Sequence, residues 1–553
     1  MNKLIKFLQD KNPFDRESSL RNVVTGVIAA EKVNVTQAKE VGDSILDGMF
    51  GKKVCNYTFQ KKDTAITMES KSKIQIDAED VHIDPQLLFQ RLVIIGTQKD
   101  KLNEAFRHEL CGFPAALFER RDVLLKATKP VLANAIWELA PAISDEDQEQ
   151  LESSHIKHVI DRGALLHRIL WENGQTYDAT CQRYATYVMR KYKQPTVIFD
   201  GYDCGPAPKD GTQSRRIRSG AVRDVHVSPG MQLNMKKDDI LASKTNKQKF
   251  INMLSSSLEK SGCEVHQADG DADIVIVAHA LKSAETCDTI VVGDDTDLMI
   301  LLCHHATSNH KKLYFHPEAK SGQQRRYMDI HKARSELGDQ VCRDLLFVHA
   351  MLGCDTTSRL FGFGKAVGLK LIQTNETFIE QAKVFNRSGC TQSEVAAAGE
   401  KAILCLYKTT AKIDDLNELR HQRFLELVKT SKKEIQPKSL PPTSAAAKFH
   451  SQRVYHQVQA WKNVGLDAEE WGWKIVDGQM IPVQTCEDVA PRELLEFVRC
   501  QCKTGCSTNH CSCKKTGISC TTACGECRGV CENGGDDGTE MTDGTDENND
   551  PQY

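Results

Sequence analysis

The chain has 553 residues, which at roughly 150 residues per domain predicts three to four domains. It carries 75 acidic and 72 basic residues, a formal net charge of −3, and 40% of its residues are hydrophobic. This composition excludes a wholly disordered chain and a collagen-like chain. The charge is unevenly spread, because residues 532–553 hold eight Asp or Glu and no Lys or Arg, which leaves the other 531 residues at +5.

The start of the chain, MNKLIKFLQDKNPFDRES, has no long apolar stretch and no small-residue cleavage site, so we do not expect a signal peptide. No run of about 18 apolar residues occurs, so we expect no membrane span. Of the 21 cysteines, twelve are scattered between Cys55 and Cys486 and nine lie between Cys500 and Cys531. Scattered cysteines without a secretion signal indicate a reducing compartment, and we expect the nucleus, with the cytoplasm as the alternative.

The chain divides by pattern into five parts. Residues 1–150 are expected to be mainly helical, with no motif that we can tie to chemistry. Over 156–375, short apolar runs alternate with helix-like stretches, which predicts an α/β domain with a parallel sheet. Residues 376–495 again predict helices, 498–531 a small cysteine-rich domain, and 532–553 a disordered acidic tail.

Aspartates recur at the ends of the expected strands. The run HVI precedes Asp161, TVIF precedes Asp200, and TIVVG precedes the acids of DDTD. GDAD and LGCD lie beside apolar helices. The seven aspartates are Asp161, Asp200, Asp271, Asp273, Asp295, Asp297 and Asp355. Because ligands of open α/β sheets bind at the carboxyl ends of the strands, we expect these side chains to converge at one edge.

Several carboxylates gathered together repel one another unless a cation lies between them. Mg²⁺ and Mn²⁺ prefer oxygen ligands, and two such ions about 4 Å apart can stabilise the attacking and leaving oxygens of a phosphodiester displacement. The pattern therefore predicts metal-assisted phosphodiester hydrolysis with two Mg²⁺ or Mn²⁺ ions. For any single Asp, a helix cap or a turn is the simpler explanation, but it accounts poorly for the paired acids of DAD and DTD.

Two other enzyme classes use similar letters. A GDD run can mark a polymerase, although three residues are a weak signal. A haloacid-dehalogenase-type phosphatase needs a D-x-D arrangement after its first strand, whereas the strands here are followed by DRG and by DGYD.

The order of these motifs resembles the flap endonuclease (XPG-type) branch of the PIN-like nucleases. HVIDRGALLHRIL, VIFDG, GDADIVIVAHAL, GDDTDLMIL and LGCDTTSRLFGFGKAVGLKLI resemble five motifs of that family, in the family's order, over about 156–375. The resemblance implies a structure-selective DNA nuclease in which the seven aspartates are catalytic. Two Glu of the family are the shorter Asp here, at Asp271 and Asp273, and about 155 residues precede Asp161. A DNA- or chromatin-binding protein with an inactive nuclease fold is therefore the alternative.

Two basic or glycine-rich stretches are candidate nucleic-acid contacts. FGFGKAVG follows the last aspartate, where the resembled family holds DNA with a helical hairpin, and its candidates are Gly362, Gly364, Lys365 and Lys370. SRRIRSGAVR follows the second strand, where that family has a basic arch, and its candidates are Arg215, Arg216, Arg218 and Arg223. The simpler explanations are a glycine turn and a solvated charged loop.

The nine cysteines lie within 32 residues, at Cys500, Cys502, Cys506, Cys511, Cys513, Cys520, Cys524, Cys527 and Cys531. In a reducing compartment, this density predicts zinc rather than disulfides. Three zinc ions need twelve ligand positions, so nine thiolates suffice if three of them bridge two ions each.

The spacing resembles the Tesmin/TSO1-like CXC domain, which binds zinc in this shared manner and often binds DNA. In that family a Tyr often precedes the second C-x-C, where this chain has His510. Lys503, Lys514 and Lys515 supply positive charge for phosphates. A zinc-stapled module without DNA is the alternative. The order of parts is similar to that of multi-copy animal proteins derived from mobile elements, and DNA is the expected partner, with RNA as the alternative.

Overall fold

The structure is a computed structural model that describes residues 38–50, 72–76, 79–83, 104–317, 326–491 and part of 500–533, with short internal gaps of which 210–224 is the longest. The predicted arginines at 215–223 and the side chains of Lys503 and Lys515 lie outside the described part. The chain forms two compact units, one of residues 1–121, 412–446 and 485–553 and the other of residues 122–411 and 447–484.

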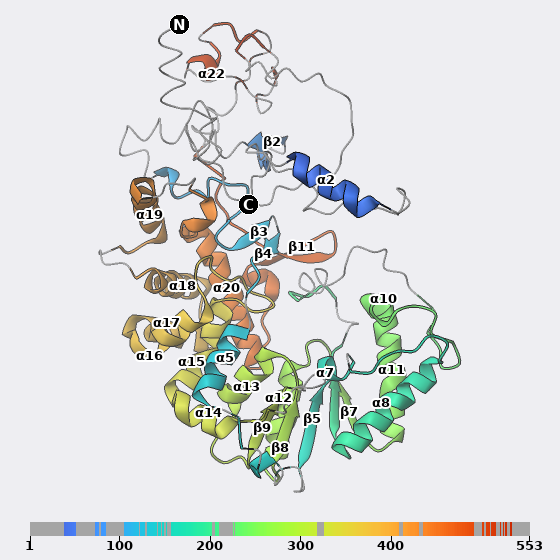
Figure 1. Cartoon of the computed structure of the whole chain (residues 1–553). Helices are drawn as coiled ribbons and strands as arrows, with labels where there is room; N and C mark the ends of the chain where they lie inside the picture. The colour runs from blue at the N-terminus through green and yellow to red at the C-terminus, as the bar shows by residue number, and fades with distance from the viewer. Residues whose placement is uncertain are drawn as a thin grey trace. The chain divides into compact units, whose positions relative to one another are not determined.

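The second unit is built on a mixed sheet, which confirms the expected α/β class with its mostly parallel sheet (Figure 1). Its strands run in the order β10-β9-β8-β5-β6-β7, and only β10 is antiparallel to its neighbour. The strands are β5 (Lys157–Asp161), β6 (Thr196–Phe199), β7 (Glu264–Gln267), β8 (Thr289–Val292), β9 (Leu313–His316) and β10 (Met328–Asp329).

Helices cover both faces of this sheet. Val197 and Phe199 share a core with α8 (Tyr177–Tyr192) and α11 (Lys244–Lys260), while Ile198 between them is also fully buried. Because side chains alternate along a strand, burial of all three means that both faces are covered. On the side away from α8 and α11, α12 (Asp273–Ala284) packs on β5 and β8 and against α13 (Thr296–His305) (Figure 1).

The rest of this unit is mostly helical. In addition to β4 (Val123–Leu124), β11 (Trp473–Val476), β12 (Gln479–Pro482) and the short η5 (Ala468–Trp471), it contains α5 (Pro130–Leu139), α7 (Arg162–Leu166), α10 (Lys237–Ala242), α14 (Ile330–Leu337), α15 (Asp339–Met351), α16 (Lys365–Thr374), α17 (Glu376–Asn386), α18 (Gln392–Leu406) and most of α20 (Ser444–Trp461). This unit holds helices of the 376–495 part together with the α/β sheet.

The first unit has a small core around Phe106, Phe424 and Leu440. Its elements are α2 (Ala38–Met49), β1 (Ser72–Ile76), β2 (Glu79–Ile83), β3 (Phe118–Arg120), α19 (Leu416–Thr430), η4 (Pro437–Ser439) and α22 (Ser512–Lys515). The β1–β2 hairpin lies in the stretch that was expected to be mainly helical. Among the described residues, no helix is both long enough and apolar enough to cross a membrane.

Candidate active site

Three of the predicted aspartates stand at the carboxyl ends of adjacent strands. Asp161 is the last residue of β5, Asp200 directly follows β6, and Asp295 lies three residues after the end of β8. Strands β8, β5 and β6 are neighbours in the sheet, so the three side chains share one edge. Asp161 and Asp295 each accept a local backbone hydrogen bond, from Gly163 and Asp297, so the capping or turn explanation holds for these two as well. Asp200 accepts instead from the distant backbone N–H of Ala272.

Asp295, Asp297 and Asp355 form the tightest group. One oxygen from each lies within 4.8 Å of the others. Asp295 caps the N-terminus of α13, which directs Asp297 inward as a buried residue. Asp355 comes from the sharp turn after α15, where Gly353 has a φ of +98° and a Cβ would lie 2.6 Å from the backbone N of Arg359. The group can supply three oxygen ligands, which suits a hard divalent cation.

Asp271 and Asp273 are held beside this edge by a backbone contact. The Gly201 N–H donates to the carbonyl of Gly270 over 2.8 Å, and a Cβ on Gly201 would lie 2.3 Å from the carbonyl oxygen of Asp269. Only glycine allows the segment after β6 to approach this closely. The hydrogen bond from Ala272 N to Asp200 Oδ1 ties the same two segments together, so the DAD pair lies next to Asp200.

Lys209 is a further functional candidate, which no sequence motif marks. Its Nζ forms ion pairs with Asp271 and, over 3.2 Å, with Asp273. Burial lowers the pKa of Lys209, but the charges of Asp273, Asp271 and Asp297 outweigh this effect and hold its pKa well above the ordinary value. Burial raises the pKa of Asp273, and the neighbouring carboxylates add to this effect although Lys209 opposes it. The three carboxylates around one lysine leave an excess of negative charge that favours binding of a cation.

Asp297 also has a buried partner that the sequence did not reveal. His349 Nε2 lies 2.8 Å from Asp297 Oδ1, and neither side chain is more than 1% exposed. The other ring nitrogen of His349 lies 2.5 Å from Lys365 Nζ. The sequence signal was only a lone histidine inside the apolar helix LLFVHAM, which is more often a core residue than part of a site.

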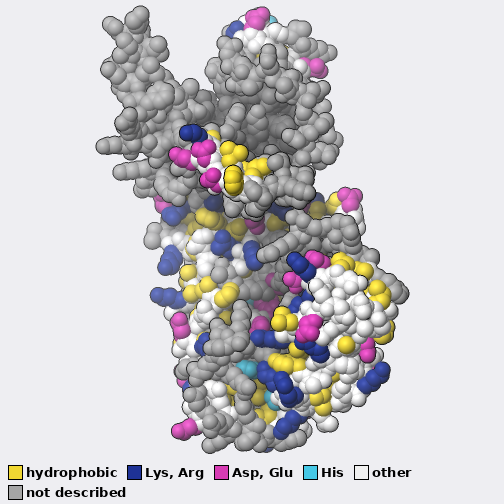
Figure 2. Space-filling model, turned by 45° about the vertical axis from the view of Figure 1, so that its right-hand side comes forward, with side chains coloured by type: hydrophobic (Ala, Val, Ile, Leu, Met, Phe, Trp, Pro, Cys, Tyr) yellow, Lys and Arg dark blue, Asp and Glu magenta, His cyan; other side chains and the backbone are white. Residues whose placement is uncertain are grey.

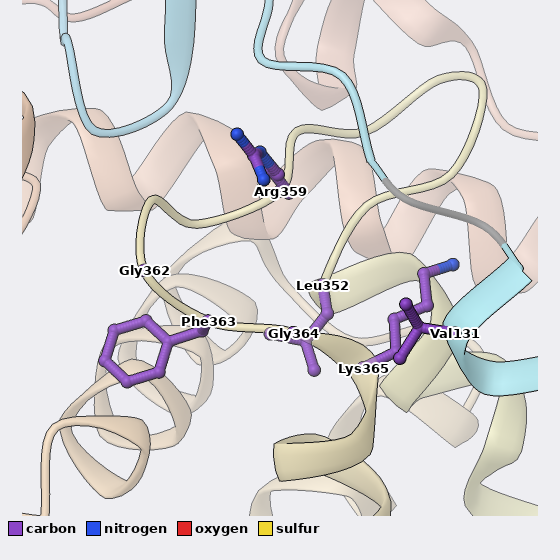
Figure 3. A pocket seen from close by; sticks show the side chains of 7 residues that line it. All are labelled: Val131, Leu352, Arg359, Gly362, Phe363, Gly364 and Lys365. Carbon is purple, nitrogen blue, oxygen red and sulfur yellow. The ribbon is translucent and has the colours of Figure 1, made fainter. Parts of the chain in front are cut away.

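The glycine-rich turn before α16 lines a pocket (Figure 3). Its lining residues are Val131, Leu352, Arg359, Gly362, Phe363, Gly364 and Lys365. Gly362 has a φ of +86°, Gly364 is the N-cap of α16, and both are exposed. Lys370 is exposed as well, whereas Lys365 is 2% exposed with its amine on His349. Lys365 therefore does not stand on the surface, where the prediction of a phosphate contact would require it.

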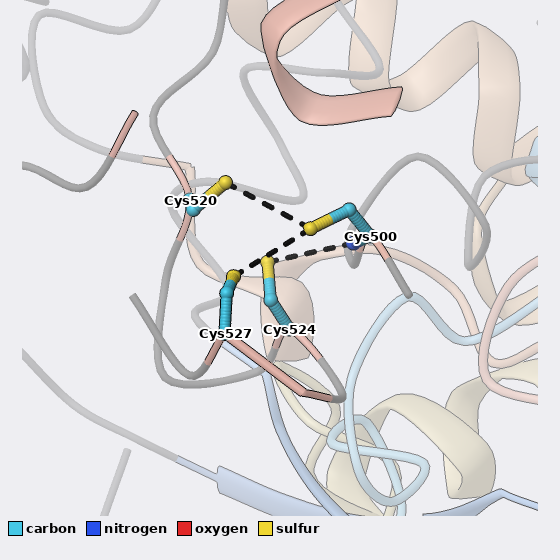
Figure 4. Close-up of side chains that lie close together, drawn as sticks. All are labelled: Cys500, Cys520, Cys524 and Cys527. Atoms are coloured by element: carbon cyan, nitrogen blue, oxygen red, sulfur yellow. Dashed lines mark hydrogen bonds between the residues drawn. The ribbon is translucent and has the colours of Figure 1, made fainter. Parts of the chain in front are cut away.

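The cysteine cluster belongs to the other unit, and its thiols converge (Figure 4). Sγ–Sγ distances are 3.6 Å for Cys500–Cys506, 3.8 Å for Cys500–Cys520 and 3.6 Å for Cys500–Cys527. A disulfide requires about 2.05 Å, whereas a tetrahedron with Zn–S bonds of about 2.3 Å separates sulfurs by about 3.8 Å. The observed spacing therefore fits shared tetrahedral thiolate sites.

Three overlapping sets of four cysteines can each surround an ion. They are Cys500, Cys520, Cys524 and Cys527; Cys500, Cys506, Cys511 and Cys520; and Cys506, Cys520, Cys527 and Cys531. Together the sets use seven of the nine thiols; Cys520 occurs in all three of them, and Cys500, Cys506 and Cys527 in two each. Of the predicted phosphate contacts nearby, His510 is exposed, and Lys514 is partly buried with its amine on the carbonyl of Ser507.

A third group of metal-type ligands lies on β7 and α12. Glu264, His266 and His279 each offer one atom within 4.8 Å of the others. Glu264 already accepts hydrogen bonds from His266, Thr196 and Lys157, and the His266 bond in particular lowers the pKa of this carboxyl to about 2. The carboxylate is thus satisfied by the protein itself.

The chain was compared with protein families, with curated proteins and with solved structures. Residues 1–109 match a family described as "Domain of unknown function (DUF8702)". No curated protein matches the chain. Among solved structures, the catalytic core of Rad2 in complex with DNA substrate is similar at 16% identity and a TM-score of 0.29, over 44% of this chain and 66% of that chain. The Holliday junction-resolving enzyme GEN1 in complex with product DNA and Mg²⁺ is similar at 13% identity and a TM-score of 0.30, over 61% of this chain and 65% of that chain.

Flap endonuclease-1 from Methanococcus jannaschii is similar at 12% identity and a TM-score of 0.28, over 58% of this chain and 98% of that chain. The chain thus spans just under two thirds of the Rad2 and GEN1 chains. At these identities and TM-scores, function has to be inferred from the site itself.

Proposed function

We propose that the chain is a divalent-metal-dependent nuclease that hydrolyses phosphodiester bonds of DNA. The observation that carries this proposal is the convergence of Asp295, Asp297 and Asp355 within 4.8 Å, beside Asp271 and Asp273 with Lys209 between them. The donor set is made of carboxylate oxygens, and its excess negative charge suits Mg²⁺ or Mn²⁺.

In this site the aspartates at the sheet edge would hold the divalent ions, and Asp161 and Asp200 would complete the set from β5 and β6. When bound, such ions supply a water nucleophile of lowered pKa and neutralise the charge that develops on the phosphate. Lys209 is the cationic side chain placed to balance the acids and to orient a phosphate oxygen. The exposed Gly362 and Gly364 at the N-terminus of α16 are suited to hold the backbone of the nucleic acid. Figure 2 shows Lys and Arg side chains beside Asp and Glu side chains on the lower part of the face that it draws, and basic side chains attract phosphates.

The test is cleavage of flap, single-stranded and duplex DNA in Mg²⁺ and in Mn²⁺. Asp295→Ala/Asp297→Ala is expected to lower the cleavage rate at least about 1,000-fold, because both changes remove metal ligands. Asp294→Ala is the matched control: this acid belongs to the same GDDTD run but pairs with Arg168 over 3.7 Å and is 57% exposed. A double variant as active as the wild type would refute the nuclease. Competition with RNA identifies the preferred nucleic acid.

The cysteine-rich domain is proposed to hold about three zinc ions and to tether the nuclease to DNA in the nucleus. The Sγ–Sγ distances of 3.6–3.8 Å and the shared sets of thiols support this assignment. Native mass spectrometry should find about three zinc ions per chain. A purified protein that contains no zinc would refute the zinc assignment.

One observation favours a second function, a DNA- or chromatin-binding protein whose nuclease fold is inactive. Lys209 already pairs with Asp271 and Asp273, so a protein cation stands where an ion would otherwise balance them. This alternative predicts DNA binding without cleavage, binding that survives Asp295→Ala/Asp297→Ala and that is lost when the cysteines are replaced.

A further inference from the structure

A lysine, a histidine and an aspartate form a buried chain behind the acidic edge. Lys365 is the first residue of α16, His349 lies in α15 and Asp297 in the first turn of α13. Lys365 Nζ lies 2.5 Å from His349 Nδ1, and His349 Nε2 lies 2.8 Å from Asp297 Oδ1. The three residues are 2%, 0% and 2% exposed. This row of hydrogen-bonded side chains therefore connects three helices, away from solvent, and ends on a carboxylate of the proposed metal site.

The direction of the two hydrogen bonds follows from the chemistry of the groups. A lysine ammonium has donors only, so it donates to Nδ1 of His349. The histidine then carries its hydrogen on Nε2 and donates it to Asp297. This arrangement fixes one tautomer of the ring and gives each of the three groups a partner.

Lys365 occupies an unfavourable place for a lysine. Burial of an ammonium costs free energy unless a partner compensates it. The N-terminus of a helix also disfavours a cation, because the helix macrodipole is positive there. The contact to His349, and through it to Asp297, offsets these costs, so a purely apolar residue would pack at this position with less conflict.

We propose that His349 and Lys365 are positioning residues that fix the Asp297 carboxylate for binding of a divalent cation together with Asp295 and Asp355. The inference rests on the proposed metal-dependent function. His349 engages Oδ1 of Asp297 and thereby sets the direction of Oδ2, while the backbone N–H of Asp297 donates to Asp295 Oδ1 over 3.0 Å. His349 thus fixes the side chain of Asp297, and the backbone of Asp297 fixes the side chain of Asp295. The charge of Lys365 offsets part of the repulsion between the two carboxylates. Partners behind a metal ligand typically contribute 10–100-fold to metal affinity.

The test compares two substitutions of similar size in the full-length, zinc-loaded protein. His349→Gln keeps an acceptor for Lys365 and a donor for Asp297, whereas His349→Met keeps only the bulk. Mn²⁺ affinity is measured without DNA, from the electron paramagnetic resonance signal of free Mn²⁺. His349→Met is expected to weaken Mn²⁺ binding about 10–100-fold, and His349→Gln to recover most of that loss. Equal affinities of the two variants would overturn the proposal, because packing alone does not distinguish them.

Lys365→Met is expected to weaken Mn²⁺ binding in the same direction. Lys383→Met is its control, since Lys383 is an exposed lysine on α17 paired with Glu380. A second measurement uses thermal unfolding of the same zinc-loaded protein with no Mn²⁺ or Mg²⁺ added. The change in Tm caused by His349→Met is expected to shrink when Asp297 is already Asn, because the hydrogen bond to an ionised carboxylate is then gone. If the changes in Tm of the His349 and Asp297 substitutions simply add, the proposed hydrogen bond between these two side chains is overturned.

Failure of this inference and failure of the proposed function give different results. A wild-type protein that binds Mn²⁺, follows the predicted order of variants and cuts no DNA would refute the nuclease and support the positioning chain. A wild-type protein that binds no Mn²⁺ would overturn both.

Discussion

The acidic edge and the cysteine cluster are both candidate metal sites, but they are built in opposite ways. The acidic ligands come from residues 161–355 and meet because parallel strands end at one edge of a sheet. The cysteines come from 500–531, and the longest helix described there is the four-residue α22. The acidic site thus depends on a large apolar core that exists without metal, whereas the core described around the cysteines consists of the cysteines themselves. Metal should therefore matter very differently to the stability of the two.

The largest expected effect is unfolding of the cysteine-rich domain when zinc is removed. Structural zinc in small domains contributes roughly 10–16 kcal/mol of apparent binding free energy, and no other core is described around these residues. Treatment with a strong chelator should make residues 500–531 exchange amide hydrogens rapidly, while helices such as α15 stay protected. Hydrogen exchange read by mass spectrometry checks this, and protection that persists in both regions would contradict it.

Single cysteine substitutions sharpen the same contrast. Cys520 occurs in all three sets of four thiols and Cys502 in none of them. Cys520→Ser is expected to lose most of the bound zinc, and Cys502→Ser at most one ion. Native mass spectrometry of the two variants measures the difference. Equal losses would show that the thiols are not shared as the distances suggest.

A buried carboxylate outside the acidic edge gives the next largest effect. Burial raises the pKa of Asp344 to about 6, despite hydrogen bonds from Gln340 and Asn386. Because this pKa is higher in the folded state than in the unfolded state, the protonated form favours folding, and that contribution is lost as pH rises from about 4 through about 6. Its size is about 3 kcal/mol.

Asp344→Asn should remove this pH dependence. Denaturant unfolding at pH 4.5 and at pH 7.5 is expected to show a smaller fall in stability for the variant than for the wild type. His450, whose pKa burial lowers to about 3, acts in the opposite direction and is common to both proteins. An unchanged difference between the two pH values would contradict the assignment.

The smallest effect is expected at the acidic edge itself. Burial and neighbouring carboxylates raise the pKa of Asp273, so its ionised form costs folding free energy above that pKa. In EDTA at pH 8, Asp273→Asn should therefore raise Tm by a few degrees, although the lost ion pair with Lys209 reduces the gain. Addition of Mn²⁺ should stabilise the wild type more than the variant. A lower Tm for the metal-free variant would show that Lys209 already balances the cluster.

Strand ends and cysteine spacing were accessible from the sequence because both are local patterns. The runs before Asp161 and Asp200 form β5 and β6, and the expected α/β sheet is present. The β1–β2 hairpin lies within a stretch expected to be mainly helical, and Lys365, predicted to contact a phosphate because it follows the last aspartate, is buried. A lysine carries no local signal of burial, since burial depends on which helices pack over it.

The sequence by itself determined which chemical groups are available: nine thiols within 32 residues, and aspartates placed after apolar strands. Only the tertiary structure decided which of them meet. It brought Asp295 and Asp297 to Asp355, placed Lys209 between Asp271 and Asp273, and buried Lys365 against His349. The physical reason is the distance along the chain. Neighbouring cysteines are constrained by a few bonds, whereas residues on different helices and strands, 16 positions apart for Lys365 and His349 and about 60 for the acidic groups, meet only through the register of the sheet and the packing of helices on it.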